Sequence, residues 1–92
     1  MARSPQQNIA DSLQISEQLL FSDLDLAFTF VQCARVSSIA KTKKRNVAYA
    51  AKAYRDVSER SLDLVMDVQL RKDLNTRLAL LKQQLAELGV DV

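Results

Sequence analysis

The fold is decided by residues 74–88, which read LNTRLALLKQQLAEL. Five leucines stand at spacings of 4, 3, 4 and 3 in this stretch, so they share one face of an α-helix. We call them the leucine stripe, which consists of Leu74, Leu78, Leu81, Leu85 and Leu88. Because an apolar stripe of this length must be covered by other apolar side chains, we predict that it forms one wall of a helical core.

The remaining sequence also favours helices. Its 92 residues include a single Gly and a single Pro, Gly89 and Pro5, so no strong helix breaker lies between Gln6 and Leu88. Hydrophobic residues make up 48% of the chain and charged residues 26%, which is typical of one small globular domain. We therefore predict an all-α fold, an antiparallel up-down-up three-helix bundle over residues 22–92.

The N-terminal part is expected to differ from the bundle. Residues 1–21 are predicted to be a polar, partly disordered segment, frayed over residues 1–8, in which a short helix is possible. The residues that would share a face of that short helix are Ile9, Leu13, Ser16 and Leu20. Ser22 and Asp25 resemble a capping box, which indicates that the first bundle helix starts there and runs to about Lys41.

Each helix of the predicted bundle has an apolar face. The first should point Leu24, Ala27, Phe28, Val31 and Ala34 inward. Residues 41–46 break the apolar period, and Asn46 could cap the second helix. The inward face of that helix is predicted to carry Val47, Ala50, Ala51, Tyr54, Val57, Ser58, Ser61, Leu62 and Val65.

The boundary before the third helix is the least marked in the sequence. Asp67 is the one capping signal between residues 62 and 70, and a continuous helix is the alternative to a turn there. At the other end, Gly89 can adopt left-handed geometry, which predicts that the third helix stops near Leu88.

The residue inventory argues against catalysis. The chain has no His and only one Cys, so it lacks the commonest general base and the ligands of a thiolate zinc site. It also has no Gly-rich loop that could cradle a phosphate. We therefore expect a protein that is not an enzyme, with no catalytic residues, metal, cofactor or small-molecule substrate.

The lone Cys33 lies in an apolar stretch, which predicts a buried thiol and excludes an internal disulfide. The N-terminus lacks the apolar run of a secretion signal. No stretch approaches the roughly 18 uncharged apolar residues of a membrane span. A cytoplasmic protein without a transmembrane segment is the expectation.

Charge is concentrated in one part of the chain. Residues 35–55 contain seven basic residues and no acidic one, although the net charge of the whole chain is only +2. Lys41, Lys43, Lys44 and Arg45 are therefore candidate ligands for an anion, either a nucleic acid or an acidic membrane. Solvated helix-end cations are the simpler interpretation. Nucleic acid is not favoured, because interleaved aromatic residues and a Gly-bearing helix-turn-helix are absent.

Two further patterns concern partner binding. Phe30 and Leu80 fall outside the apolar stripes, and their exposure would indicate a groove or a dimer face. The small-and-Tyr pattern of Ala50, Ala53 and Tyr54, followed by Val57, is similar to the second helix of microtubule-interacting-and-trafficking (MIT) domains, which are three-helix bundles related in shape to tetratricopeptide hairpins.

Arg77, Leu81 and Lys82 resemble the Arg and Leu-Lys of the third helix in that family, and the similarity covers roughly residues 23–88. The resemblance implies that a short helical peptide docks in a groove between helices, with Arg77, Leu81 and Lys82 as contacts. We accordingly predict a protein–protein interaction or assembly module that binds a helical partner or itself. An anion-binding module that uses the basic residues is the alternative.

Overall fold

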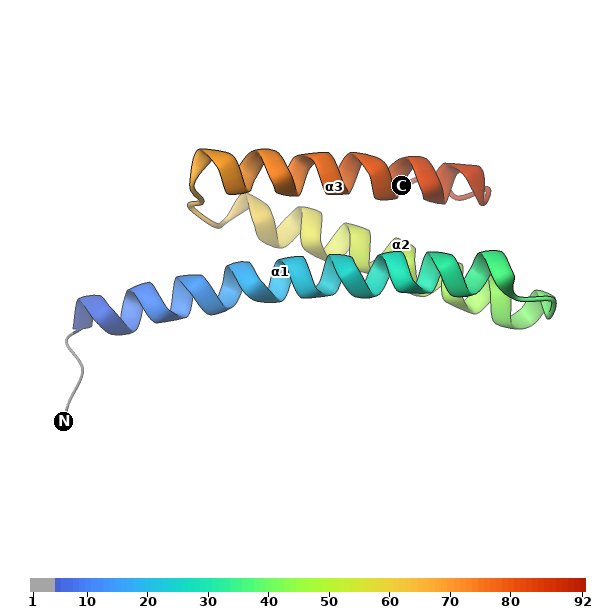
Figure 1. Cartoon of the computed structure of the whole chain (residues 1–92), viewed down its shortest axis with the longest axis horizontal. Helices are drawn as coiled ribbons and strands as arrows, with labels where there is room; N and C mark the ends of the chain where they lie inside the picture. Colours follow the sequence, from blue (N-terminus) through green and yellow to red (C-terminus); the bar gives the residue numbers. More distant parts are fainter. Residues whose placement is uncertain (1–4) are drawn as a thin grey trace.

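The computed structural model describes the backbone of residues 5–92 and the side chains of residues 16–92. It contains helices α1 (Pro5–Val36), α2 (Ala40–Leu62) and α3 (Val68–Glu87), and no strand within the described residues. Successive helices run in opposite directions (Figure 1), which confirms the predicted all-α up-down-up bundle.

The core lies along the predicted apolar faces. Leu74, Leu81 and Leu85 have no exposed surface, Leu78 is buried beside them and Leu88 is half-buried, so the first four leucines of the stripe form the α3 wall of the core as predicted. The other core side chains are Leu20, Leu24, Ala27, Val31 and Ala34 of α1 and Val47, Ala50, Ala51 and Val57 of α2. Each large aliphatic side chain buried here contributes about 1.5 to 3 kcal/mol relative to an exposed one.

Helix α1 is longer than predicted, because it passes through Ser22 without a break and crosses the expected boundary between residues 21 and 22. Leu20 and Leu24 are both buried, so one apolar stripe continues across the proposed capping box. Asp23 pairs with Arg60 of α2, and burial of the stripe outweighs the local capping signal. Residues 5–8 belong to α1, whereas residues 1–4, also predicted to be frayed, lie outside the described residues.

The connection between α1 and α2 also differs from the prediction. It spans residues 37–39, so residues 41–46 form the first turns of α2 and Asn46 does not cap it. The Ser37 hydroxyl donates to the Ile39 carbonyl (3.2 Å) and accepts from the Ile39 N–H (3.3 Å), so one side chain bonds both backbone groups of Ile39. Lys and Arg are good helix formers, so the basic run continues the helix that begins at Ala40.

Both ends of α3 agree with the sequence. The Asp67 carboxylate accepts the Gln69 N–H at 3.0 Å, so the predicted cap is confirmed and the continuous helix is excluded. Gly89 has a φ of 87°, and the Val90 N–H reaches the Leu85 carbonyl at 2.9 Å in the arrangement of a Schellman cap. Leu62 and Val65, predicted to face inward, are exposed; Leu62 is the last residue of α2, and Val65 lies beyond it in the turn.

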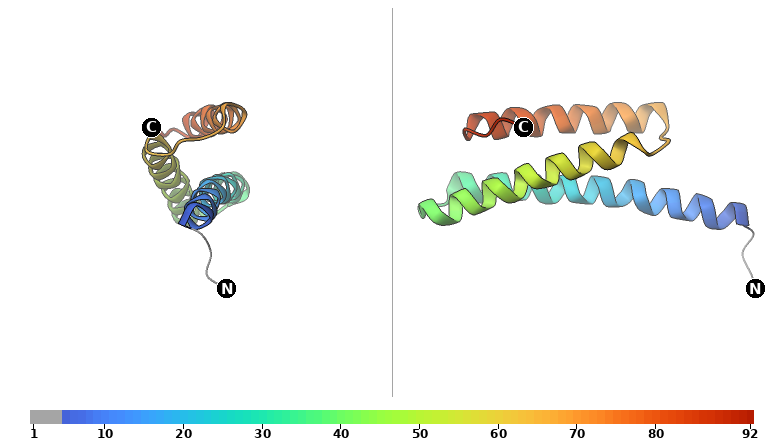
Figure 2. Two further views of the ribbon diagram at one scale, coloured as in Figure 1. Left: turned by 90° about the vertical axis from the view of Figure 1, so that its left-hand side faces the viewer. Right: turned by 180° about the vertical axis from the view of Figure 1, so that it is seen from behind.

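The helices do not form a closed triangle. Seen end-on, α2 occupies the corner between α1 and α3 (Figure 2), and α1 contacts α2 far more extensively than it contacts α3. The molecule measures 54 × 27 × 16 Å, and the first turns of α1 project beyond the α2–α3 turn (Figure 1).

Candidate interaction surfaces

The residues predicted to bind a partner do not form one surface. The ring of Phe30 lies 5.2 Å from that of Tyr49, centroid to centroid, so it belongs to the α1–α2 pair. Arg77 instead faces α1, where its Nη1 lies 3.3 Å from Asp25 Oδ1. Leu80 is 47% exposed on α3. Lys82 is also exposed and forms no ion pair with the described residues.

Two predictions about individual residues are corrected. Leu81 is 0% exposed, so it belongs to the core and cannot contact a partner directly. Cys33 is exposed and not buried. It lies seven residues from Leu26, which places both on the same side of α1, and Leu26 is exposed as well. The apolar stretch around Cys33 is therefore wider than the face that the bundle covers.

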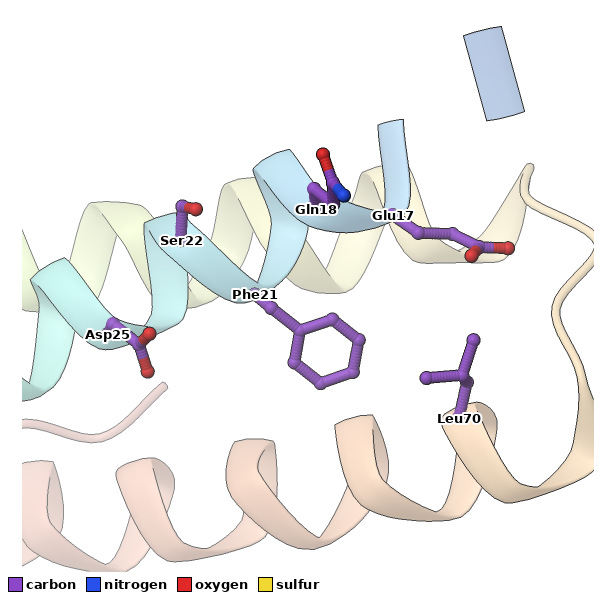
Figure 3. Close-up of a pocket in the computed structure, with 6 residues that line it drawn as sticks. All are labelled: Glu17, Gln18, Phe21, Ser22, Asp25 and Leu70. Atoms are coloured by element: carbon purple, nitrogen blue, oxygen red, sulfur yellow. The ribbon is translucent and has the colours of Figure 1, made fainter. Parts of the chain in front are cut away.

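A cleft separates α1 from α3 near the start of α3 (Figure 3). It has a volume of about 500 Å³ and is lined by Glu17, Gln18, Phe21, Ser22, Asp25 and Leu70. The Phe21 ring points towards α3 and Leu70 points towards α1 without filling the space between the helices. The guanidinium carbon of Arg77 lies 5.1 Å from the centroid of the Phe21 ring, within cation–π range.

Exposed ion pairs bridge the same two helices. Besides Asp25–Arg77, Arg35 Nη2 lies 2.9 Å from Glu87 Oε2. Pairs this exposed contribute about 0 to 1 kcal/mol each, so they add little to the packing of α1 against α3. Near them on α3, the Oε1 atom of Gln84 is buried and accepts no hydrogen bond.

The second surface lies where the α2–α3 turn meets α1. We call it the apolar end, and its residues are Leu19, Leu62, Val65 and Val68, all exposed. Val65 is 86% exposed, and Leu19 borders a smaller cleft whose walls include Asp63 and Leu64 of the turn. Sequence reasoning missed this surface, because the helical period assigned Leu62 and Val65 to the core. The weak boundary signal between residues 62 and 70 was the only hint that the period stops there.

The third surface lies at the opposite end of the bundle. We call it the basic loop, and it comprises Val36, Ile39, Lys41, Lys43, Lys44 and Arg45. All six residues are exposed, and none of the four cations forms an ion pair within the part of the chain that the structure describes. Lys43 and Lys44 line a cleft of about 290 Å³ with Leu88 and Val90 from the C-terminal segment. The four predicted anion ligands thus lie at the start of α2, and two of them, Lys43 and Lys44, border the same cleft.

Comparison of the chain with protein-family models, curated proteins and solved structures yields no match. The resemblance to MIT domains therefore stays a prediction. Among residues whose side chains are described, no three His, Cys, Asp or Glu gather as metal ligands would. Within the same part of the chain, no helix combines the length and the apolar character that a bilayer crossing requires.

Proposed function

We propose that this protein is a non-enzymatic assembly module that binds a second copy of itself through the apolar end. The observation that carries the proposal is the exposure of Leu62, Val65 and Val68 together at one end of the molecule. Exposed apolar side chains that cluster in this way mark interaction sites more often than isolated ones do. A cytoplasmic location belongs to the same proposal, because a lone exposed thiol such as Cys33 suits a reducing compartment.

The projecting part of α1 supports a second copy as the occupant. Its first turns extend past the α2–α3 turn, where no other helix of the same chain accompanies them (Figure 1). A helical segment of only a few turns is marginal in water when no neighbouring helix packs against it. Two copies related by a twofold axis would each lay this projection against the apolar end of the other, so both unpartnered features are covered in one closed dimer.

The test is the oligomeric state of the full chain, measured by sedimentation velocity from micromolar to millimolar concentration. We expect a reversible dimer for the wild type and a monomer for Val65→Asp/Val68→Asp, because the buried carboxylates would have no partner. The matched control is Val36→Asp/Ile39→Asp, which changes two exposed apolar residues at the other end and should leave the dimer intact. A wild-type monomer at millimolar concentration contradicts the proposal, as does a control that dissociates equally.

A helix from a different protein is the second candidate occupant, and the α1–α3 cleft favours it. Phe21 and Leu70 offer an apolar floor there, so the fitting helix is amphipathic and places an apolar face in the cleft. Arg77 and Leu80, on the α3 side, stay its predicted contacts. The test is affinity capture with three baits: the wild type, Leu70→Asp and Val65→Asp/Val68→Asp. A partner that binds the cleft is captured by the wild type and by Val65→Asp/Val68→Asp, but not by Leu70→Asp.

A further inference from the structure

We propose that the basic loop binds the surface of an anionic lipid membrane. The proposal is independent of self-association, because it concerns the opposite end of the bundle. It rests on the combination of four unpaired cations with two strongly exposed aliphatic side chains in one short segment.

The charges of the basic loop are available to a ligand. Lys41, Lys43, Lys44 and Arg45 are exposed in the first turns of α2, and no Asp or Glu occurs between residues 26 and 55. The nearby Arg35 is already paired with Glu87 across to α3. The other carboxylate in this part of the fold is Asp91, which follows Val90 of the adjoining cleft. The four free cations therefore outnumber the acidic groups at this end.

The exposed apolar residues of the basic loop favour a lipid surface over nucleic acid as the anionic ligand. Val36 is 82% exposed and Ile39 is 62% exposed, and they flank the serines of the turn between α1 and α2. The charged phosphates of a nucleic-acid backbone make no favourable contact with aliphatic side chains. The bases of single-stranded nucleic acid usually stack on exposed aromatic rings. Tyr49, the nearest described aromatic residue in α2, pairs with Phe30 although it is 47% exposed, and no aromatic residue lies in the basic loop itself. A lipid interface accepts both groups, because cations bind the headgroups while aliphatic side chains enter the acyl boundary.

The shape of the molecule permits this contact. The α1–α2 loop lies at one extremity of the longest axis, beyond the end of α3 in both side views (Figures 1 and 2). A flat surface can therefore meet the turn between α1 and α2 without collision with α3.

The first experiment is co-sedimentation of the full chain with vesicles of phosphatidylcholine alone or mixed with phosphatidylglycerol, at low and high NaCl. We expect binding to the anionic vesicles only, and a loss of binding at high salt. Lys43→Gln/Lys44→Gln should weaken the partition coefficient by about 25-fold, since each cation near an anionic surface contributes about fivefold. The matched control is Lys72→Gln/Lys82→Gln, which removes the same charge from exposed residues of α3 and should change binding little.

The second experiment tests insertion of the aliphatic residues. The chain has no Trp, so Ile39→Trp supplies a single fluorophore, whose emission should shift to the blue on anionic vesicles. Leu80→Trp, at a half-exposed position on α3, should show no shift. Val36→Ser/Ile39→Ser should lower the partition coefficient about tenfold, with Leu26→Ser/Leu80→Ser as the control.

Three outcomes overturn the proposal. One is equal binding to neutral and anionic vesicles, and another is unchanged binding of Val36→Ser/Ile39→Ser. The third is that the chain binds no vesicles but binds duplex DNA or single-stranded RNA tightly, and that Val36→Ser/Ile39→Ser does not change this binding. Such a result would assign the cations to nucleic acid.

Discussion

The exposed fraction of the side chain differs sharply between neighbouring positions in α3. Leu80 is half exposed, whereas Leu81, one residue further, is completely buried. A helix turns by about 100° per residue, so adjacent positions face different surroundings. For this reason Leu81 stabilises the core although resemblance to a family suggested that it contacts a partner. Gln84, three residues beyond, lies at the edge of the same face and buries its Oε1 without a hydrogen bond.

The unpaired oxygen of Gln84 leads to a stability prediction. A buried acceptor that lost its water without gaining a donor is destabilising by about 1 to 3 kcal/mol. We expect Gln84→Met, which keeps the length of the side chain, to raise the free energy of unfolding by about 1 kcal/mol in urea denaturation. Gln83→Met, at an exposed neighbouring position, should change it by less than about 0.5 kcal/mol. Destabilisation by Gln84→Met would show that the amide has a partner in solution.

At the scale of elements, some helix ends could be predicted from the sequence and others could not. The sequence predicted the start of α3 at Asp67 and its end at Gly89, because each residue acts through its own backbone or side chain. The starts of α1 and α2 were misplaced, since Ser22 and Asn46 can cap a helix but also fit inside one. Which role each takes depends on whether the apolar stripe continues past it, and that is decided by packing against another helix.

The caps can be tested directly. Asp67→Ala should lower the free energy of unfolding by about 1 kcal/mol, because the Gln69 N–H loses its acceptor. Asn46→Ala should be neutral or raise it by about 0.5 kcal/mol, since Ala is the better residue inside a helix. Chemical denaturation followed by circular dichroism distinguishes the two. A loss with Asn46→Ala as large as that with Asp67→Ala would move the start of α2 back to Asn46.

For the whole molecule, the candidate surfaces were less predictable than the core. The four cations of the basic loop form a run in the sequence, so their proximity could be predicted. Exposure of Val65 and Val68 could not, because it requires the position of the α2–α3 turn in space. The α1–α3 cleft likewise results from the angle between helices, which is set by many side chains at once.

Self-association predicts a change in hydrogen exchange at this scale. Amides of residues 5–15, in the projecting turns of α1, should exchange more slowly in the wild type at dimer-forming concentration than in Val65→Asp/Val68→Asp. Amides of residues 37–39, at the other end of α1, serve as the internal control and should exchange equally in both proteins. Exchange that is the same at residues 5–15 in the two proteins would show that the projection takes no part in the contact.

The apolar end and the basic loop lie towards opposite ends of a molecule 54 Å long, and the first turns of α1 reach past the apolar end. A dimer joined at its apolar ends therefore carries one basic loop at each far tip, pointing in opposite directions. On the two proposals above, such a particle is bivalent, and it can hold two separate bilayers at a fixed spacing, which is shorter than twice the monomer length because the two α1 projections overlap. Tethering of this kind makes liposomes cluster, and a monomeric variant that still binds lipid leaves them dispersed.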